Sequence, residues 1–209
     1  VTSKIGKDAI LLGQSSISVK AIGTQWTDVT VKADGGGFVD FADAEANSNI
    51  NHEVKTSIDG TLIAGETILV ESKSSVRGEV DATADARGLG ANADANEISD
   101  EEGQTEKGLR IGLSGDLALT QTTIENDGYL RSPLVEVGAE ARIRADVDSD
   151  SFAGALGADS DAVARAYVDD LAKVILKGDS LIEGDRVELK SIHDNIRLDV
   201  RADAKADAL

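Results

Sequence analysis

A segment of the sequence recurs about every 52 residues, and this periodicity constrains the fold more than any other feature. Residues 62–72 (LIAGETILVES) match residues 181–191 (LIEGDRVELKS) at their Leu, Ile, Gly and Ser positions and in the phase of their other apolar residues. Looser copies begin at Leu11 and Asp127. We take Gly13, Gly65, Ser132 and Gly184 as equivalent turn positions. Successive positions are 52, 67 and 52 residues apart.

The longer middle interval holds 15 extra residues and contains an acidic, apolar-poor stretch, 96–108. One loop inserted into the second copy of the repeating unit accounts for both facts. We therefore interpret residues 1–209 as a single segment of four imperfect repeats. Their predicted bounds are about 10–54, 55–115 with the acidic loop 96–108, 116–170 and 171–209.

Apolar and charged residues alternate strictly in three parts of the repeats. Residues 79–86 and 199–208 carry apolar side chains at even positions, and residues 140–148 carry them at odd positions. Such alternation predicts a strand with a buried Ala and Val face and a charged outer face. A helix would spread the charges around its circumference and leave no apolar stripe.

The stretch 161–176 fits either element. Helical spacing would use Val163, Tyr167 and Leu171 among others. The strand reading, which we prefer, has a turn at Asp169-Asp170 after four inward residues, which are Ala162, Ala164, Ala166 and Val168.

Strands with such small inward side chains cannot each build a core, but stacked coils can. The sequence therefore predicts an all-β fold, a parallel β-helix (β-solenoid) of imperfect repeats of about 52 residues. Coils of ~20–26 residues, as in other solenoids, would give two rungs per repeat. The predicted corners are Asp59-Gly60, Asp127-Gly128 and Lys177-Gly178-Asp179. Because the ends carry no evident cap, we expect the chain to continue at both ends or copies to stack end to end.

Composition excludes several classes of protein. A formal net charge of −18 repels phosphate backbones, so nucleic-acid binding is disfavoured. The absence of Cys excludes a disulfide scaffold and thiolate-bound zinc. No apolar run approaches the ~18–20 residues that a membrane helix needs. Without Met, and without a signal sequence after Val1, the chain is expected to be an excised or processed piece.

One part of the chain resembles a known group of repeats. The run Ala166-Tyr167-Val168, then residues 178–189 (GDSLIEGDRVEL), then the Ala-alternating tail, is similar to repeats of giant secreted bacterial β-strand-repeat proteins, the filamentous-haemagglutinin-like adhesins and their relatives. The similarity runs from about Ile10 in four imperfect passes, with more charge and less Thr and Gly than is usual. It implies a secreted or cell-surface location and a role as stalk, fibre or adhesive.

Two histidines are the natural acid–base or ligand candidates. His52 and His193 lie far apart in the sequence, and we expect each to be a surface loop residue, with His193 in a turn at 191–195. No nucleophile elbow, phosphate-binding loop or dinucleotide fingerprint occurs, and Gly35-Gly36-Gly37 is expected to be a turn. No catalytic, cofactor-binding or metal-binding residue is therefore predicted.

Calcium is the one cofactor that the acidic residues could bind. The candidate ligands are Asp146, Asp148 and Asp150 on one strand face, with Asp159 and Asp161 beyond a Gly-rich turn. Alternate residues on one face stand about 6–7 Å apart, whereas Ca²⁺ needs oxygens converging at ~2.3–2.6 Å. A solvated acidic face is the preferred interpretation.

The leading functional hypothesis is a non-catalytic structural or adhesive segment of an extracellular fibre or surface adhesin, with end-to-end self-association and contact to a surface or glycan. The alternative is a polysaccharide-processing or glycan-binding β-helix protein. Such a protein needs a groove of aromatic residues. Trp26, Tyr129 and Tyr167 are far apart in the sequence, so we expect them to be isolated packing residues. Thr does not recur at a fixed phase, which disfavours ice binding.

Overall fold

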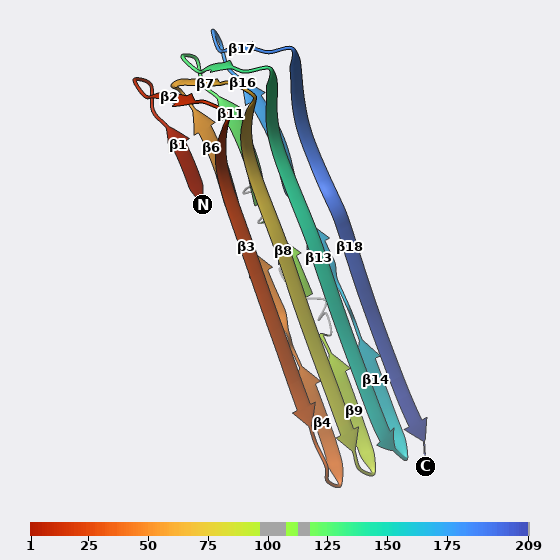
Figure 1. Ribbon diagram of the computed structural model, residues 1–209. Helices are drawn as coiled ribbons and strands as arrows, with labels where there is room; N and C mark the ends of the chain where they lie inside the picture. The colour runs from red at the N-terminus through yellow and green to blue at the C-terminus, as the bar shows by residue number, and fades with distance from the viewer. Residues whose placement is uncertain (97–107, 113–117, 209) are drawn as a thin grey trace.

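The computed structural model describes residues 1–96, 108–112 and 118–208, and every regular element in this part of the chain is a β-strand. The strands form five sheets, and every strand pairs with its neighbours in parallel. The chain winds into a flattened coil whose successive turns lie side by side (Figure 1). The prediction of an all-β parallel β-solenoid is confirmed. Among the described residues there is no helix that could span a membrane.

One face of the solenoid is a single sheet of the longest strands, which we call the long sheet. Its strands are β3 (Ser16–Asp34), β8 (Thr67–Arg87), β13 (Leu134–Ala155) and β18 (Arg186–Ala208). A small corner sheet precedes it at the top of Figure 1. The strands of the corner sheet are β2 (Ile10–Gly13), β7 (Thr61–Ala64), β12 (Tyr129–Arg131) and β17 (Leu181–Glu183).

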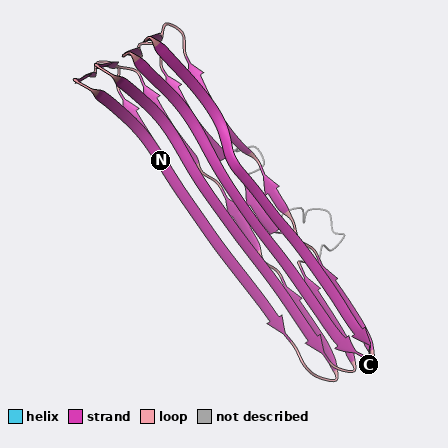
Figure 2. Cartoon of the chain, turned by 45° about the vertical axis from the view of Figure 1, so that its right-hand side comes forward, coloured by secondary structure: helices cyan, strands magenta, loops and turns pink. Residues whose placement is uncertain are grey.

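The chain returns along the opposite face through three short sheets, so that the molecule has two thin layers (Figure 2). The lower sheet contains β4 (Val39–Ala44), β9 (Gly90–Ala95) and β14 (Gly157–Ala162). The middle sheet contains β5 (Asn47–Ile50), β10 (Gly108–Ile111) and β15 (Ala166–Val168). The upper sheet contains β1 (Thr2–Ile5), β6 (Glu53–Ile58), β11 (Ala118–Ile124) and β16 (Asp170–Leu176).

Each repeat makes one coil. Ser16 pairs with Thr67, and Leu134 pairs with Arg186, so stacked residues are separated in sequence by one whole repeat. The expectation of shorter coils, with two rungs per repeat, is therefore wrong. Each strand of the long sheet spans the whole sheet without a corner, so one turn of the coil contains all the residues of one repeat.

The register also corrects two details of the predicted repeat. Gly13 stacks on Ala64, not on Gly65, so the second turn position was placed one residue too late. The 15 extra residues of the second repeat are divided between two places. The difference in residue number between a residue and its partner in the preceding coil, which we call the stacking separation, is 51 at Ala95, 61 at Gly108 and 66 at Leu119. Ten extra residues thus precede Gly108 and five follow Ile111. Most of the predicted acidic loop, 97–107, lies outside the described residues.

The predicted corners lie where the chain passes from the upper sheet to the corner sheet. They are stacked so closely that a side chain would not fit at one of them. A Cβ atom on Gly128 would stand 2.7 Å from the carbonyl oxygen of Ile58 in the coil beside it. Glycine is needed there because the backbones of neighbouring coils touch.

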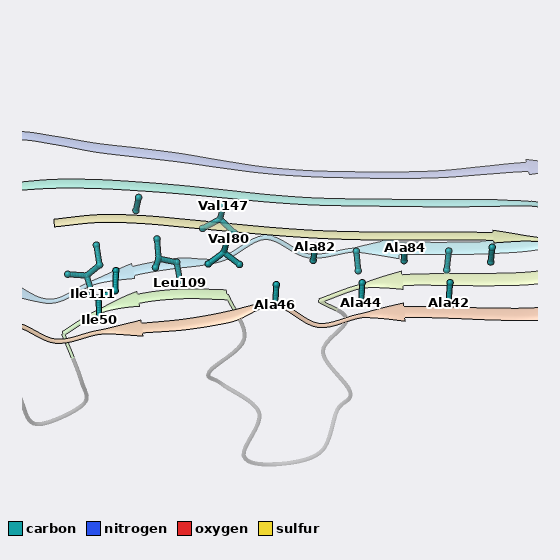
Figure 3. Close-up of a cluster of buried hydrophobic side chains, with 14 of the residues drawn as sticks. Ala42, Ala44, Ala46, Ile50, Val80, Ala82, Ala84, Leu109, Ile111 and Val147 are labelled. Carbon is teal, nitrogen blue, oxygen red and sulfur yellow. The ribbon is translucent and has the colours of Figure 1, made fainter. Parts of the chain in front are cut away.

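The alternating residues form the core, as the pattern predicts. In β8 the inward Val80, Ala82 and Ala84 are buried (Figure 3), as is Ala86, and their outward neighbours are charged or polar. The stretch 161–176 is extended, in β14, β15 and β16, so the strand interpretation is confirmed and the helical one is wrong. Its inward alanines pack against the core.

The core consists of two clusters of different composition. The lower cluster is rich in Ala and includes Ala42, Ala44 and Ala82 (Figure 3). The upper cluster, which includes Ile58, Leu62 and others at the corner end, is built of Ile, Leu and Val with a single Ala. A fully buried large aliphatic side chain contributes about 1.5–3 kcal/mol, more than Ala can. The corner end therefore supplies more hydrophobic stabilisation per residue.

Candidate functional site

A row of buried hydroxyl groups lies inside the solenoid and belongs to neither apolar cluster. We call it the polar seam, and its members are Thr56, Ser72, Ser74, Thr120 and Thr122. The upper sheet contributes the threonines and the long sheet contributes the serines. The seam therefore connects the two layers in the interior.

The hydroxyls of the polar seam bond to each other and to backbone carbonyls. The Ser72 hydroxyl lies 2.9 Å from that of Thr56 and 2.9 Å from that of Thr122. It also donates to the Gln121 carbonyl oxygen at 2.7 Å. Ser74 and Thr120 are 2.6 Å apart. Buried hydroxyls satisfied in this way fix the register of the two layers, since a shift would leave them unpaired.

The two histidines meet at a buried carboxylate near the same level of the molecule. Asp170, the first residue of β16, has a side chain that is only 1% exposed. Nε2 of His193 lies 2.9 Å from its Oδ2, and Nε2 of His52 lies 3.3 Å from its Oδ1. The His52 side chain is itself 7% exposed. The two carboxylate oxygens thus each face one imidazole.

The stacking of coils explains how distant residues reach Asp170. Ala118 of the third coil pairs with Asp170 of the fourth, and the next residue, Leu119, pairs with Glu53 of the second coil. His52 is therefore separated from Asp170 by one coil, at the level of Ala118. Because Ala118 has only a methyl side chain, the His52 ring can extend past it.

His193 approaches Asp170 from the opposite layer. It lies in β18 and pairs with Ala141, an inward-facing residue of β13. The register shifts directly afterwards, and Asn195 adopts a left-handed conformation with φ 62°. The expectation that His193 lies in a surface turn is wrong, because a bulge inside a strand takes up the Asp194-Asn195 pair. The expectation for His52 is also wrong, since this residue is in a connection but its side chain is buried.

Burial dominates the electrostatics of this cluster. Burial lowers the pKa of His52, although Asp170 acts in the opposite direction. Burial also raises the pKa of Asp170, against the effect of His52 and of the hydrogen bond from His193. Both shifts favour the uncharged forms. Among the described residues, neither ring nitrogen of His52 has a hydrogen-bond partner, nor does Oδ1 of Asp170. Nε2 and Oδ1 therefore face each other without a hydrogen bond.

A cleft of about 420 Å³ beside the first coil reaches this cluster. His52, Asn51, Gly23 and Gln25 are among the residues that line it. The hydroxyls of the neighbouring seam, Ser74 and Thr120, are bonded to one another and not to an imidazole. The arrangement can accept and release protons, but it places no activated nucleophile from the described residues beside the histidines.

The calcium candidates are divided between the two faces of the molecule. The inward hydroxyls of Ser151 and Ser160 meet inside the core at 2.7 Å. Asp150 and Asp161, each adjacent in sequence to one of these serines, therefore point outward from opposite layers. The five carboxylates do not converge. Within the described residues, no group of three or more His, Cys, Asp or Glu side chains is arranged to hold a metal ion.

Several outward carboxylates of the long sheet, including Asp146, are instead paired with basic residues on the same strand. Arg77 contacts Glu79, and Arg144 contacts Asp146, each at 2.7 Å. Arg197 and Asp199 repeat the arrangement at 3.2 Å in the last coil. The same two-residue spacing thus produces a row of ion pairs across three coils. In the first coil, Trp26 takes the place of the arginine and lies under the Arg77 guanidinium at 6.0 Å.

The three aromatic candidates lie on three different sheets. Trp26 is in β3, Tyr129 in β12 and Tyr167 in β15. The Tyr129 hydroxyl donates to Glu183 at 2.6 Å, and the Tyr167 ring stacks with Arg110 at 5.7 Å. These residues do not form a common groove.

Comparison of the chain with protein-family models, with curated proteins and with solved structures finds no match in any of the three.

Sequence reasoning missed both Asp170 and the polar seam. A signal for Asp170 exists, since it occupies the position at which the second and third coils carry His52 and Ala118. That alignment requires the stacking separation between the second and third coils in the upper sheet, which is 66. The turn residues lie in another part of the repeat and gave 67, and the separation is indeed 68 in the corner sheet and 67 in the long sheet.

Proposed function

We propose that this chain is a non-catalytic structural segment of an extended fibre or adhesin outside the cell. The observation that carries the proposal is the continuous stack of coils, in which each coil pairs in parallel with the next and the described residues pair with the outermost strands on one side only. An open stack of this kind is extended by adding further coils, each contacting only its neighbours.

The surface supports a role in water outside the cell. Charged outward side chains are paired along β8, β13 and β18, so much of the long sheet is well solvated. The resemblance of residues 166–208 to the repeats of filamentous-haemagglutinin-like adhesins favours secretion or surface display. The high negative charge also opposes non-specific collapse of neighbouring fibres.

The distribution of aromatic residues supports a structural role over the glycan-processing alternative. An enzyme or lectin of the β-helix class needs several aromatic rings along one groove to hold sugar rings. Here Trp26, Tyr129 and Tyr167 are on separate sheets. The Asp170 cluster lies inside the solenoid beneath a cleft whose described lining includes no Trp, Tyr or Phe.

Electron microscopy and light scattering of the purified chain test the proposal. Four stacked coils advance by only ~19 Å along the axis, so end-to-end assembly gives particles many times longer than one chain. We expect the mean particle length to increase with protein concentration. A monomer at all concentrations, together with binding or cleavage on a polysaccharide panel, would support the alternative. Antibody labelling of intact cells of the native organism tests the location.

A further inference from the structure

At the two ends of the described stack, no described residue pairs with the outer edges of the same three sheets. The last coil ends with the edges of β16, β17 and β18, and the first coil begins with those of β1, β2 and β3. β18 alone is 23 residues long, and none of the other described residues pairs with its outer edge. An edge of this length is a template for another strand.

We call a set of residues that stack on one another, one from each coil, a column. Two columns on the outer surface have apolar residues in the first and last coils and polar residues in the two coils between. One column runs Ile22, Lys73, Glu140, Ile192, and its two central residues form an ion pair at 3.1 Å. The other runs Ile10, Thr61, Tyr129, Leu181. All four terminal residues are exposed. If the last coil met the first coil of another copy in the same register, each would gain an apolar neighbour.

The charges near the far end of the long sheet are complementary in the same register. Lys32 begins a column that ends with Asp203, and Asp34 begins a column that ends with Lys205. The joint would therefore bring together two pairs of opposite charge. Arg197 would come beside Trp26 as Arg77 does within the chain.

Two like-charge pairs also arise across the joint. Asp199 would lie beside Asp28, but the same column already stacks Asp28 on Glu79 and Asp146, with arginines two residues away. Lys190 would lie beside Lys20, and each already contacts a glutamate of its own chain.

We propose that a second copy of this chain docks head to tail, with β16, β17 and β18 of one copy pairing in parallel with β1, β2 and β3 of the next, so that Ile192 lies beside Ile22 and Asp203 beside Lys32. This inference rests on the proposed function and adds the partner and the register. The joint continues three of the five sheets. The described residues of the fourth coil contribute no strand to the lower and middle sheets.

Engineered cysteines test the register directly, because the chain contains none. Ser16 and Arg186 belong to one column, so they would be neighbours across the joint at ~4.8 Å, within disulfide reach. Within one chain they are three rungs apart, at ~14 Å, which is too far. Oxidation of the Ser16→Cys/Arg186→Cys variant should give a ladder of covalent multimers that a reductant removes.

Matched variants separate register from mere proximity. Ser16→Cys/Arg201→Cys moves the second thiol ~50 Å along the strand and should give no ladder. In the first background, Asp203→Lys should reduce the multimer yield roughly two- to fivefold, and adding Lys32→Asp should restore it. Circular dichroism confirms that each variant is folded.

The outcomes distinguish this inference from the proposed function. Fibres without a disulfide ladder overturn the register and leave the fibre role standing. Dimers from the single Ser16→Cys variant, in place of a ladder from the double variant, indicate head-to-head contact and overturn the inference. Absence of both ladder and fibres overturns both proposals.

Discussion

The Asp170 carboxylate lies 3.3 Å from Nε2 of His52, although one intervening coil separates the two positions. The pair is buried, and the two atoms face each other without the alignment of a hydrogen bond. His193 satisfies the other carboxylate oxygen from the opposite layer. One carboxylate thus links the second coil, the fourth coil and both layers.

Removal of that carboxylate should destabilise the fold. In Asp170→Ala the His193 imidazole loses its hydrogen-bond partner and the buried His52 loses the carboxylate that faces it, and we expect a loss of about 1–3 kcal/mol in the free energy of unfolding. Asp169→Ala, at the exposed residue just before it, is the matched control and should change stability by no more than ~0.5 kcal/mol. Urea unfolding followed by circular dichroism measures both. Equal effects for the two variants would contradict a role for the cluster.

The stability should depend on pH through His52. Burial holds the pKa of His52 below its ordinary value of 6.5, so the unfolded chain takes up a proton before the folded chain does. The stability from this residue is present above pH 6.5 and is lost as the pH falls below it. Melting temperatures of the wild type and of His52→Gln between pH 7.5 and 5 measure this effect. The decline should be smaller in the variant, and an identical decline would refute the assignment.

Gly78 should tolerate no side chain. It faces inward, and an added Cβ atom would stand 2.4 Å from Cδ1 of Leu109 and 3.1 Å from its Cγ. Because Leu109 is fully buried, it cannot move aside, so Gly78→Ala should cost about 1–3 kcal/mol. Gly138→Ala, on the outer side of the same sheet with its nearest atom at 3.9 Å, should be neutral or slightly stabilising. Thermal unfolding of the pair would disprove the argument if both behaved alike.

The polar seam should act as a unit. Thr122→Val removes a hydroxyl that lies 2.9 Å from that of Ser72 and 2.5 Å from the Gly138 carbonyl oxygen. We expect a cost of about 1–3 kcal/mol, since the partners stay buried without it. The double variant Thr122→Val/Ser72→Ala should cost clearly less than the two single changes together. Strict additivity in a double-mutant cycle from chemical denaturation would show that the hydroxyls are independent.

Much of the fold follows from local patterns in the sequence. Strict alternation in residues 79–86 and 140–148 predicts which side chains are buried, because a strand has no other way to separate them. The recurrence of residues 62–72 at 181–191 predicts the stacking. The first signal lies within a single strand, and the second comes from the similarity of two segments of the sequence. Neither requires knowledge of three-dimensional packing.

The coil length and the site could not be obtained in that way. Residues 72–78 (SKSSVRG) contain few apolar side chains, so the pattern there does not distinguish a corner from a strand that lines a polar interior. The polar seam and the space for Leu109 occupy this part of β8. Likewise, Asp170 meets His52 only through a stack whose register is shifted by residues inserted in two places. A pattern in one coil carries no information about that shift.

A coil that consumes a whole repeat has a mechanical consequence. Each repeat lengthens the structure by only ~4.8 Å, while a strand of 22 residues spans ~70 Å across it. Each repeat therefore adds far more to the width of the structure than to its length. An assembly of many coils would be a flat tape, much wider than it is thick. Such a tape flexes readily across its two-layer thickness and resists bending in its own plane, where every strand would have to slide against the next.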